Sequence, residues 1–286
     1  MIISASRRTD IPAYYSDWMI NRINEGFVYS QNPFNPRQIR EIRLSPALVD
    51  GIVFWSKNPE PMTDKLDALK EYAYYFQFTL NSYSSDIEPN LPPREKRLET
   101  FMKLSGKTGP ERVVWRYDPI IINERYTASY HIDKFGESAG KLGGYTKKVI
   151  FSFVDFYKKI EGRLKSFDVR EAEIDEKRKI AESIALIAKS NGLPAAVCAE
   201  DMDFGMYGIS RACCVDSALI SEIKGSDVRA VKDRNQRSDC LCAASVDIGA
   251  YNSCQNGCVY CYANHNPESV KRNSGRHDKF SPLLIG

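Results

Sequence analysis

Short apolar runs rich in β-branched and aromatic residues recur along the chain, and segments with helical periodicity separate them. The runs are residues 2–6, 51–56, 74–80, 112–117, 149–156, 195–199 and 245–251. Continuous apolar character over so short a length is typical of a parallel strand that is covered on both faces. The pattern therefore predicts seven strands of a parallel sheet.

Helical periodicity is clearest over residues 175–192, where Ile180, Ile184 and Ile187 recur on one face. Similar spacing predicts further helices over residues 17–26, 62–73 and 94–106. The segment 27–46 breaks this rhythm, because its paired runs surround two Asn-Pro turn signals. We expect that segment to be a hairpin insertion.

Alternating strands and helices predict βαβ units, so we expect one α/β domain over residues 1–286 that forms a partial or nearly closed (β/α) barrel. Active sites of such folds lie at the carboxyl ends of the strands. Polar residues end or follow the predicted strands at Arg7, Arg8, Thr9, Asp10, Ser56, Lys57, Asn58, Asn81, Arg116, Asp118, Asp155 and Glu200. Because parallel strands end on the same rim, we expect these side chains to gather there.

Composition narrows the class of protein. The chain has 286 residues, of which 43% are hydrophobic and 27% charged, as in ordinary globular domains. No apolar run approaches the ~20 residues that cross a bilayer, and the first residues lack the apolar core of a signal peptide. We therefore expect a cytoplasmic protein with no membrane contact. The net charge of +3 is too small to indicate a nucleic-acid-binding surface.

The cysteines carry the strongest chemical signal. In a cytosolic chain of this length, a local cluster indicates metal or redox chemistry rather than disulfides. Cys254, Cys258 and Cys261 lie within the stretch "SCQNGCVYC", where Gly257 lets the backbone turn. Thiolates bind zinc and iron–sulfur clusters. Three ligands on a four-iron cluster leave one iron open, which by analogy with catalytic zinc sites indicates chemistry rather than scaffolding.

The spacing Cys254-x-x-x-Cys258-x-x-Cys261, with Tyr260 before the last cysteine, resembles the signature of radical SAM enzymes. The phrase "CVYCYAN" is similar to the spore photoproduct lyase branch. The resemblance implies a 4Fe–4S cluster whose open iron chelates S-adenosylmethionine. One-electron reduction, from a donor such as ferredoxin or flavodoxin, then yields a 5′-deoxyadenosyl radical. The lyase branch further implies a substrate that is a nucleic acid or a nucleotide.

The position of the motif departs from that pattern, because it usually lies near the N-terminus and here lies near the C-terminus. The resemblance therefore implies a circularly permuted barrel, in which residues 245–251 replace the family's first strand and residues 2–6 its second. We expect these two strands to pair. The whole chain also resembles the DUF1848 family of uncharacterised proteins, which has this C-terminal cysteine cluster.

The same resemblance places cofactor contacts and reacting groups on the predicted strand ends. The residues expected to bind the cofactor are Arg7, Asp10, Lys57 and Asn81. The loop from Arg7 to Asp10 takes the place that holds the methionine amino group, although it lacks the common Gly-Gly-Glu form. Arg116 and Asp118 are then expected to face the reaction centre as catalytic candidates.

The remaining cysteines allow two interpretations. One is a second iron–sulfur cluster or a zinc ion, bound by Cys198, Cys214, Cys240 and Cys242. Cys213 is left out, because side chains of adjacent residues diverge. The other interpretation is that these are scattered buried thiols.

Two further classes of function stay open at this point. The first is an iron–sulfur or zinc protein with a structural or electron-transfer role and no S-adenosylmethionine chemistry. The second is a nucleic-acid-binding module that carries a zinc knuckle. Zinc ribbons favour paired Cys-x-x-Cys and ferredoxins repeat two-residue gaps before a Cys-Pro, and neither pattern occurs in this sequence.

Overall fold

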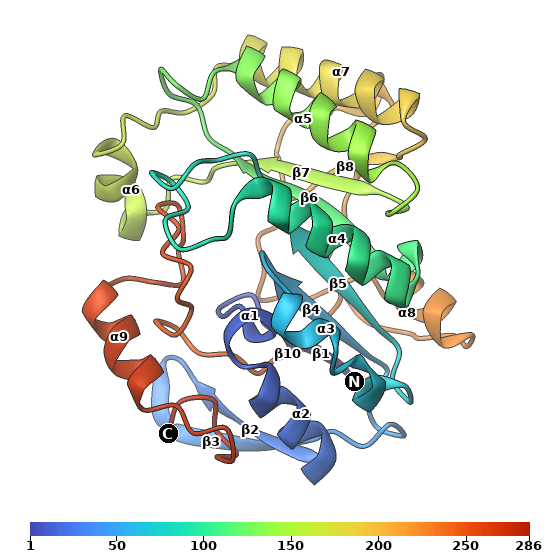
Figure 1. Ribbon diagram of the computed structural model, residues 1–286, viewed down its shortest axis with the longest axis vertical. Coiled ribbons are helices and arrows are strands. Elements are labelled where there is room, and N and C mark those ends of the chain that lie inside the picture. The colour runs from blue at the N-terminus through green and yellow to red at the C-terminus, as the bar shows by residue number, and fades with distance from the viewer.

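A computed structural model describes residues 1–286 and places eight strands in one parallel sheet (Figure 1). The sheet has the order β10-β1-β4-β5-β6-β7-β8-β9. Its strands are β1 (Ile2–Ala5), β4 (Gly51–Ser56), β5 (Tyr74–Thr79), β6 (Val113–Ile120), β7 (Val149–Phe153), β8 (Ala195–Val197), β9 (Ser210–Arg211) and β10 (Val246–Asp247). All seven expected strands are present, and the prediction of an α/β protein with a parallel sheet is confirmed.

The two edges of the sheet leave the expected partial or nearly closed barrel unconfirmed. β10 pairs with β1 in parallel, with Ile3 opposite Val246 and Ser4 opposite Asp247, so the expected pairing of the first and last strands is confirmed. The opposite edge is β9, which pairs with β8 alone. The sheet is therefore open and no barrel closes. β9 was not predicted, because two exposed residues carry no apolar run.

A second, two-stranded sheet forms within the segment expected to be a hairpin. β2 (Phe27–Asn32) and β3 (Asn35–Arg43) pair in antiparallel register. Val28 and Ile42 are buried, whereas most of β3 is exposed. The hairpin contacts the last part of the chain, where the Tyr29 N–H donates to the carbonyl of Pro282 at 2.9 Å.

The four expected helical segments are all helical, two of them with different bounds, and five further helices were not predicted. They are α1 (Ile11–Tyr14), α2 (Ser16–Glu25), α3 (Glu60–Thr63), α4 (Arg94–Thr108), α5 (Ala128–Leu142), α6 (Lys158–Lys165), α7 (Ile174–Ser190), α8 (Ser217–Lys224) and α9 (Pro267–Gly275). The helix expected over residues 62–73 is instead α3 followed by a 3₁₀ turn, Leu66–Leu69, which keeps the same apolar residues buried. α4 continues past Gly106, because a glycine weakens a helix without stopping it.

Successive residues of each strand face opposite sides of the sheet, and each side has its own apolar layer. In β4, Ile52 and Phe54 belong to the larger layer and Val53 to the smaller one. Helices α4, α5 and α7 lie along the first side (Figure 1). The second side is covered by α8 and its flanking loops, where Ile220 approaches so closely that a Cβ on Gly51 would lie 2.7 Å from it.

The segment 212–244 thus covers this second side of the sheet, which we call the inner side, and leads the chain from the β9 edge to the β10 edge. Its backbone is tied to itself, since the Ala243 N–H donates to the Val215 carbonyl at 2.9 Å. None of the helices combines the length and apolar character that a membrane span requires.

Candidate metal and cofactor site

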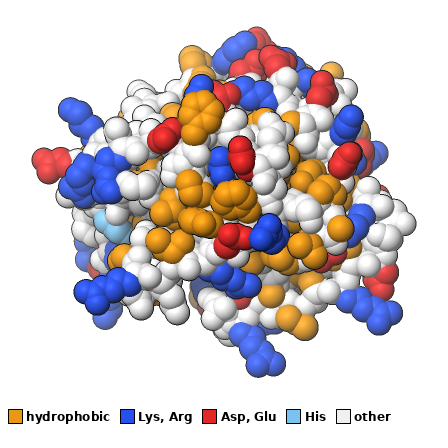
Figure 2. Space-filling view, turned by 90° about the horizontal axis from the view of Figure 1, so that it is seen from below, with side chains coloured by type: hydrophobic (Ala, Val, Ile, Leu, Met, Phe, Trp, Pro, Cys, Tyr) orange, Lys and Arg blue, Asp and Glu red, His pale blue; other side chains and the backbone are white.

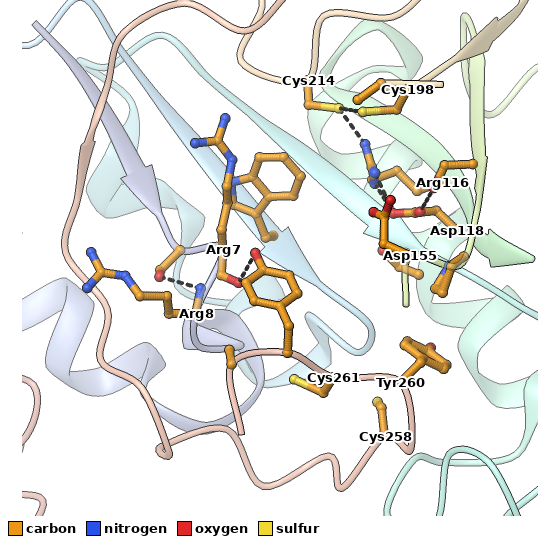
Figure 3. A pocket seen from close by; sticks show the side chains of 18 of the residues that line it. Arg7, Arg8, Arg116, Asp118, Asp155, Cys198, Cys214, Cys258, Tyr260 and Cys261 are labelled. Carbon is orange, nitrogen blue, oxygen red and sulfur yellow. Dashed lines mark hydrogen bonds and ion pairs between the residues drawn. The ribbon is translucent and has the colours of Figure 1, made fainter. Parts of the chain in front are cut away.

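A cavity of about 460 Å³ opens at the carboxyl ends of the strands (Figure 3). Its walls come from the loops after β1, β4, β7, β8, β9 and β10, from the ends of β5 and β6, and from residues 235–242. The expected strand-end residues that line it are Arg7, Arg8, Thr9, Asp10, Ser56, Lys57, Arg116, Asp118 and Asp155. Asn58, Asn81 and Glu200 lie outside the lining. Most of the polar residues at the strand ends therefore line this one cavity.

The segment after β10, residues 248–266, carries the closely spaced cysteines, and we call it the three-cysteine loop. Cys254, Cys258 and Cys261 all line the cavity; the first two are buried and the third is half-buried. Three thiols on one wall are a donor set that suits soft or borderline metals. No three His, Cys, Asp or Glu side chains of the structure already surround a common metal position.

Side chains from neighbouring elements hold the three-cysteine loop in place. The Tyr15 hydroxyl donates to the carbonyl of Ser253 at 2.6 Å, and the Tyr14 hydroxyl donates to Asn256 Oδ1 at 2.8 Å. The Asn264 amide closes the loop on itself by donating to one of its carbonyls at 2.6 Å. The α1 region therefore fixes the first half of the loop against β1.

Gly257 is required at its position for two reasons. Its φ of +70° lies in the left-handed region, which residues with a Cβ seldom adopt. A Cβ built there would also lie 3.0 Å from Pro89 and 3.1 Å from Asn90. Asn90 in turn donates to the carbonyl of Gln255 at 2.7 Å, so the loop after β5 packs directly on the three-cysteine loop.

Burial sets the protonation of these thiols in the metal-free protein. It raises the pKa of Cys254 well above the ordinary value and the pKa of Cys258 to about 12. Lys57 opposes the shift at Cys258, because its positive charge favours the thiolate. Both thiols are neutral at pH 7 without a metal, and a bound cation would reverse this by stabilising the thiolates.

Asp10 connects three loops of the site. Its Oδ1 accepts hydrogen bonds from the Ser56 hydroxyl at 2.6 Å and the Ala13 N–H at 3.1 Å. Its Oδ2 accepts from the Lys57 N–H at 2.8 Å and from the Asn256 amide at 3.1 Å. Burial raises the pKa of Asp10, and these hydrogen bonds act in the opposite direction. The carboxylate thus positions the three-cysteine loop between the loops after β1 and β4.

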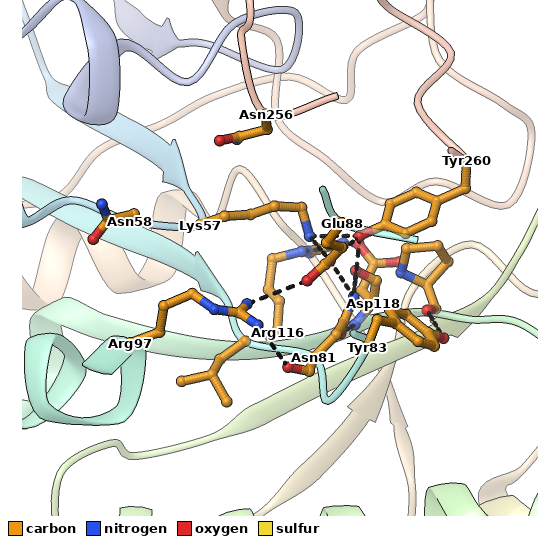
Figure 4. A network of polar contacts seen from close by, with 12 residues as sticks. Lys57, Asn58, Asn81, Tyr83, Glu88, Arg97, Arg116, Asp118, Asn256 and Tyr260 are labelled. Carbon is orange, nitrogen blue, oxygen red and sulfur yellow. Dashed lines mark hydrogen bonds and ion pairs between the residues drawn. The ribbon is translucent and has the colours of Figure 1, made fainter. Parts of the chain in front are cut away.

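Lys57 belongs to a buried charge network beside the three-cysteine loop (Figure 4). Its Nζ lies 2.9 Å from Glu88 Oε1 and 2.7 Å from the Tyr260 hydroxyl, which also donates to Glu88. Arg97 approaches the other Glu88 oxygen at 3.3 Å. Burial alone would raise the pKa of Glu88, but Lys57 and Arg97 hold it below its ordinary value. Glu88 is therefore ionised and fixes both Lys57 and the aromatic residue that precedes the third cysteine.

Asn81 lies behind the cavity wall rather than on it. Its Nδ2 donates to the Asp118 carbonyl at 2.9 Å, and its Oδ1 accepts from the Asp118 N–H at 2.8 Å. The same amide lies 3.3 Å from the Tyr260 hydroxyl. These hydrogen bonds use both the Oδ1 and the Nδ2 atoms of Asn81. Asn81 therefore joins the ends of β5 and β6 and helps to position Tyr260.

Arg116 and Asp118 form an ion pair at the end of β6, in which Arg116 is buried and Asp118 is half-buried. Arg116 Nε donates to Asp118 Oδ2 at 3.2 Å, and the Ser152 hydroxyl donates to the other carboxylate oxygen. Burial alone would raise the pKa of Asp118, but Arg116 and Ser152 hold it below its ordinary value. Arg116 also directs Nη1 to the thiol of Cys214 at 2.7 Å. The expected catalytic pair is thus an ionised pair that also contacts a cysteine.

Arg7 lines the cavity as expected, and its cofactor contact stays a prediction. Its side chain extends away from Cys258 and Cys261 and toward Cys214 (Figure 3). The guanidinium lies 5.2 Å from the centre of the Trp55 ring, and its Nη2 is buried without a hydrogen-bond partner. A guanidinium only donates hydrogen bonds, so it is unsuited to hold an amino group.

The other expected metal ligands meet on the far wall of the same cavity. The lining cysteines of this wall are Cys198, Cys214, Cys240 and Cys242. The sulfurs of Cys198 and Cys214 are 3.1 Å apart, although the two residues come from different loops. These thiols are therefore gathered rather than scattered, whereas a metal at this place stays a prediction.

Sequence reasoning missed several residues that shape the cavity. They are Trp55, Glu88, Arg97, Ser152, Arg237 and Asn256. Asn256 lies between two motif cysteines, so its place near the site could have been predicted from the sequence. Glu88 and Arg97 carried no signal, because one lies in a loop and the other on a charged helix whose buried face becomes evident only in the fold.

Comparison with known proteins gives one match. The model of a family described as "Domain of unknown function (DUF1848)" matches residues 2–263. No curated protein and no solved structure matches the chain.

Proposed function

The chain belongs to the DUF1848 family, and we propose that it is a radical SAM-like enzyme. In this proposal Cys254, Cys258 and Cys261 bind a 4Fe–4S cluster, and S-adenosylmethionine binds beside it. The observation that carries the proposal is the placement of all three thiols on the carboxyl-end cavity of a parallel sheet. The parallel pairing of β10 with β1 supports the permuted arrangement that the resemblance to radical SAM enzymes implies.

When bound, the cluster would supply one-electron reduction of S-adenosylmethionine, fed by a donor such as a ferredoxin or flavodoxin. The role of the protein is to hold the cysteine ligands and the cofactor in fixed positions relative to one another. Asp10 and Asn256 fix the loop that presents the thiols. Glu88 and Tyr260 fix Lys57 through two of its three N–H donors, which leaves one donor for an anionic group such as a carboxylate.

Arg116 and Asp118 line the same cavity and are the candidates for contact with the substrate. Because Asp118 is ionised and held by two donors, it serves as a hydrogen-bond acceptor rather than as an acid. Ser152 and Arg116 keep its oxygens oriented toward this part of the cavity.

The lyase-like resemblance adds a substrate class, a nucleic acid or a nucleotide. The size of the cavity and the distribution of surface charge favour a nucleotide over a nucleic acid. A cavity of about 460 Å³ lies in the range of small-molecule sites. On the face shown in Figure 2, Lys and Arg side chains are interspersed with Asp and Glu around an apolar centre, rather than joined in one basic surface.

The test is anaerobic reconstitution with iron and sulfide, followed by reduction in the presence of S-adenosylmethionine. We expect iron and sulfide in cluster stoichiometry and the release of 5′-deoxyadenosine. Cys258→Ala should abolish both, whereas Cys213→Ala should keep both, because Cys213 lies outside the cavity lining. Iron uptake without 5′-deoxyadenosine would favour a structural or electron-transfer protein, and zinc uptake without iron would overturn the cluster assignment.

A further inference from the structure

The cysteines on the far wall come from three segments that are distant in sequence. Cys198 follows β8, Cys214 follows β9, and Cys240 and Cys242 lie in the loop that leads to β10. The structure brings them together against the inner side of the sheet, with Val53, Tyr75 and Val114 among their apolar neighbours. Nothing in the proposed radical chemistry uses this group.

Two of these thiols are in direct contact and the other two line the same wall. Cys198 and Cys214 have their sulfurs 3.1 Å apart, and Cys240 and Cys242 line the cavity with them. The thiol of Cys213 instead donates to the carbonyls of Val215 at 2.8 Å and Leu241 at 3.0 Å, and Cys213 does not line the cavity. The far wall therefore has four cysteines that line the cavity, and Cys213 beside them does not.

Positive charge and N–H donors surround the four sulfurs. Arg116 Nη1 lies 2.7 Å from the sulfur of Cys214, and the Val215 N–H lies 3.4 Å from that of Cys242. Arg7 extends toward the same wall, and its buried Nη2 has no partner in the protein. Guanidinium groups and backbone amides are suitable neighbours for metal-bound thiolates, which carry net negative charge.

We propose that Cys198, Cys214, Cys240 and Cys242 bind one zinc ion in a tetrahedral four-cysteine site. Zn–S bonds of about 2.3 Å hold the sulfurs of such a site about 3.8 Å apart. The sulfurs of Cys198 and Cys214, 3.1 Å apart, already lie within that separation. A four-iron cluster instead spreads its cysteine ligands over separate iron corners. The close approach of these two sulfurs therefore favours a single ion.

Zinc binding changes charge and side-chain direction but not oxidation state. Each thiol releases its proton to solvent as its sulfur binds Zn²⁺, which leaves a net negative site. Arg7 and Arg116, whose guanidinium groups both lie against Trp55, are the positive charges available to balance it. Because no three of the sulfurs surround one point, the side chains must rotate to form a tetrahedron.

The site has a mechanical consequence for the fold. Cys198 is attached to the sheet, whereas Cys214, Cys240 and Cys242 belong to the two ends of the segment 212–244 that covers the inner side. A shared ion would fasten both ends of this segment to the end of β8. The zinc site is independent of the proposed radical chemistry, since it uses none of the cysteines of the three-cysteine loop.

The test is metal analysis of the full chain purified with zinc in the medium, before any iron is added. We expect one zinc ion per chain in the wild type and in the matched control Cys213→Ala. Cys214→Ala and Cys242→Ala should each lose it. Cys258→Ala should keep zinc while losing the ability to take up the cluster, which separates failure of this site from failure of the proposed function.

A second measurement uses wild-type protein alone, in case the alanine variants do not fold. The chain is alkylated with and without prior treatment by a strong chelator, and the labelled peptides are identified by mass spectrometry. We expect Cys198, Cys214, Cys240 and Cys242 to become labelled only after chelation. The proposal is overturned if Cys242→Ala retains zinc, if iron and sulfide occupy these cysteines instead, or if Cys198 and Cys214 form a disulfide in metal-free protein.

Discussion

At the scale of single residues, the site depends on a few buried charges that neutralise one another. Glu88 is 2% exposed and has Lys57 and Arg97 within ion-pair distance. Asp118 is held by Arg116 in the same way. A buried charge is tolerated only while its partners remain, because its own transfer from water is unfavourable. Removing one partner therefore costs more than the pair itself contributes.

Glu88→Gln should lower the free energy of unfolding by about 3 to 5 kcal/mol, because it leaves Lys57 and Arg97 charged without a counter-ion. Urea denaturation followed by circular dichroism measures the change. The control is Glu41→Gln, whose ion pair with Arg43 is exposed and should contribute less than about 1 kcal/mol. Equal effects of the two substitutions would contradict the buried-network account.

Asp118→Asn should lower the free energy of unfolding by about 2 kcal/mol at pH 7, because Arg116 loses its charged partner. The folded-state pKa of Asp118 lies below its ordinary value of 3.8. The stabilisation is therefore complete above pH 3.8 and is lost as the pH falls through the folded-state pKa.

Denaturation of the wild type and the Asp118→Asn variant at a series of pH values checks this dependence. Their stabilities should converge only in acid. The exposed Asp175→Asn, paired with Arg178 at the surface, serves as the control and should show no comparable difference at any pH. A difference for Asp118→Asn that grows in acid would refute the assignment.

At the scale of elements, the three-cysteine loop is positioned by its neighbours rather than by its own structure. The loop after β1, the loop after β4 and the loop after β5 each contact it, through Asp10, Lys57 and Asn90. It contains no helix or strand between β10 and α9. Its shape is therefore sensitive to close contacts with these loops.

Gly257→Ala should reduce iron incorporation several-fold and lower stability by about 1 to 2 kcal/mol, because φ is +70° and the new Cβ meets Pro89 and Asn90. Iron analysis and thermal unfolding measure the two effects. Gly144→Ala is a matched control, with φ of +85° and no atom within 4 Å of the added Cβ. It should lose similar stability and keep the iron; loss of iron in both variants would speak against a local effect.

At the scale of the whole molecule, the last strand of the chain lies beside the first. The strands could therefore occur in a different order along the chain and still form the same sheet. β10 and β1 are neighbours, although they lie at opposite ends of the sequence. The connection between α8 and β10 passes through exposed residues at Ser226 and Asp227. A chain that begins there and joins residue 286 to Met1 through a flexible linker has the same strand contacts in a different order.

We expect such a rearranged chain to fold, with the same circular dichroism spectrum and a thermal midpoint within about 8 °C of the wild type, which corresponds to about 2 kcal/mol. The control is a chain opened between Phe76 and Gln77, inside a central strand, which should fail to fold. Failure of both would show that the connection 225–245 is needed for folding.

The sequence by itself determined the class of fold, the parallel strands and the pairing of the chain's two ends. Apolar runs such as residues 51–56 and 74–80 indicated strands buried on both faces, because such strands do not alternate apolar and polar residues. The cysteine spacing predicts a metal-ligand loop, because ligands close in sequence need no fold to bring them together.

Only the tertiary structure decided the openness of the sheet, the partners of Lys57 and the far-wall cysteine group. β9 is too short to carry a pattern, so the gap beside it was not evident from the sequence. Glu88 and Arg97 meet because a loop after β5 folds back over α4, and Cys198 meets Cys214 because β8 and β9 pair. Contacts between residues far apart in the chain depend on packing, and local periodicity contains no information about them.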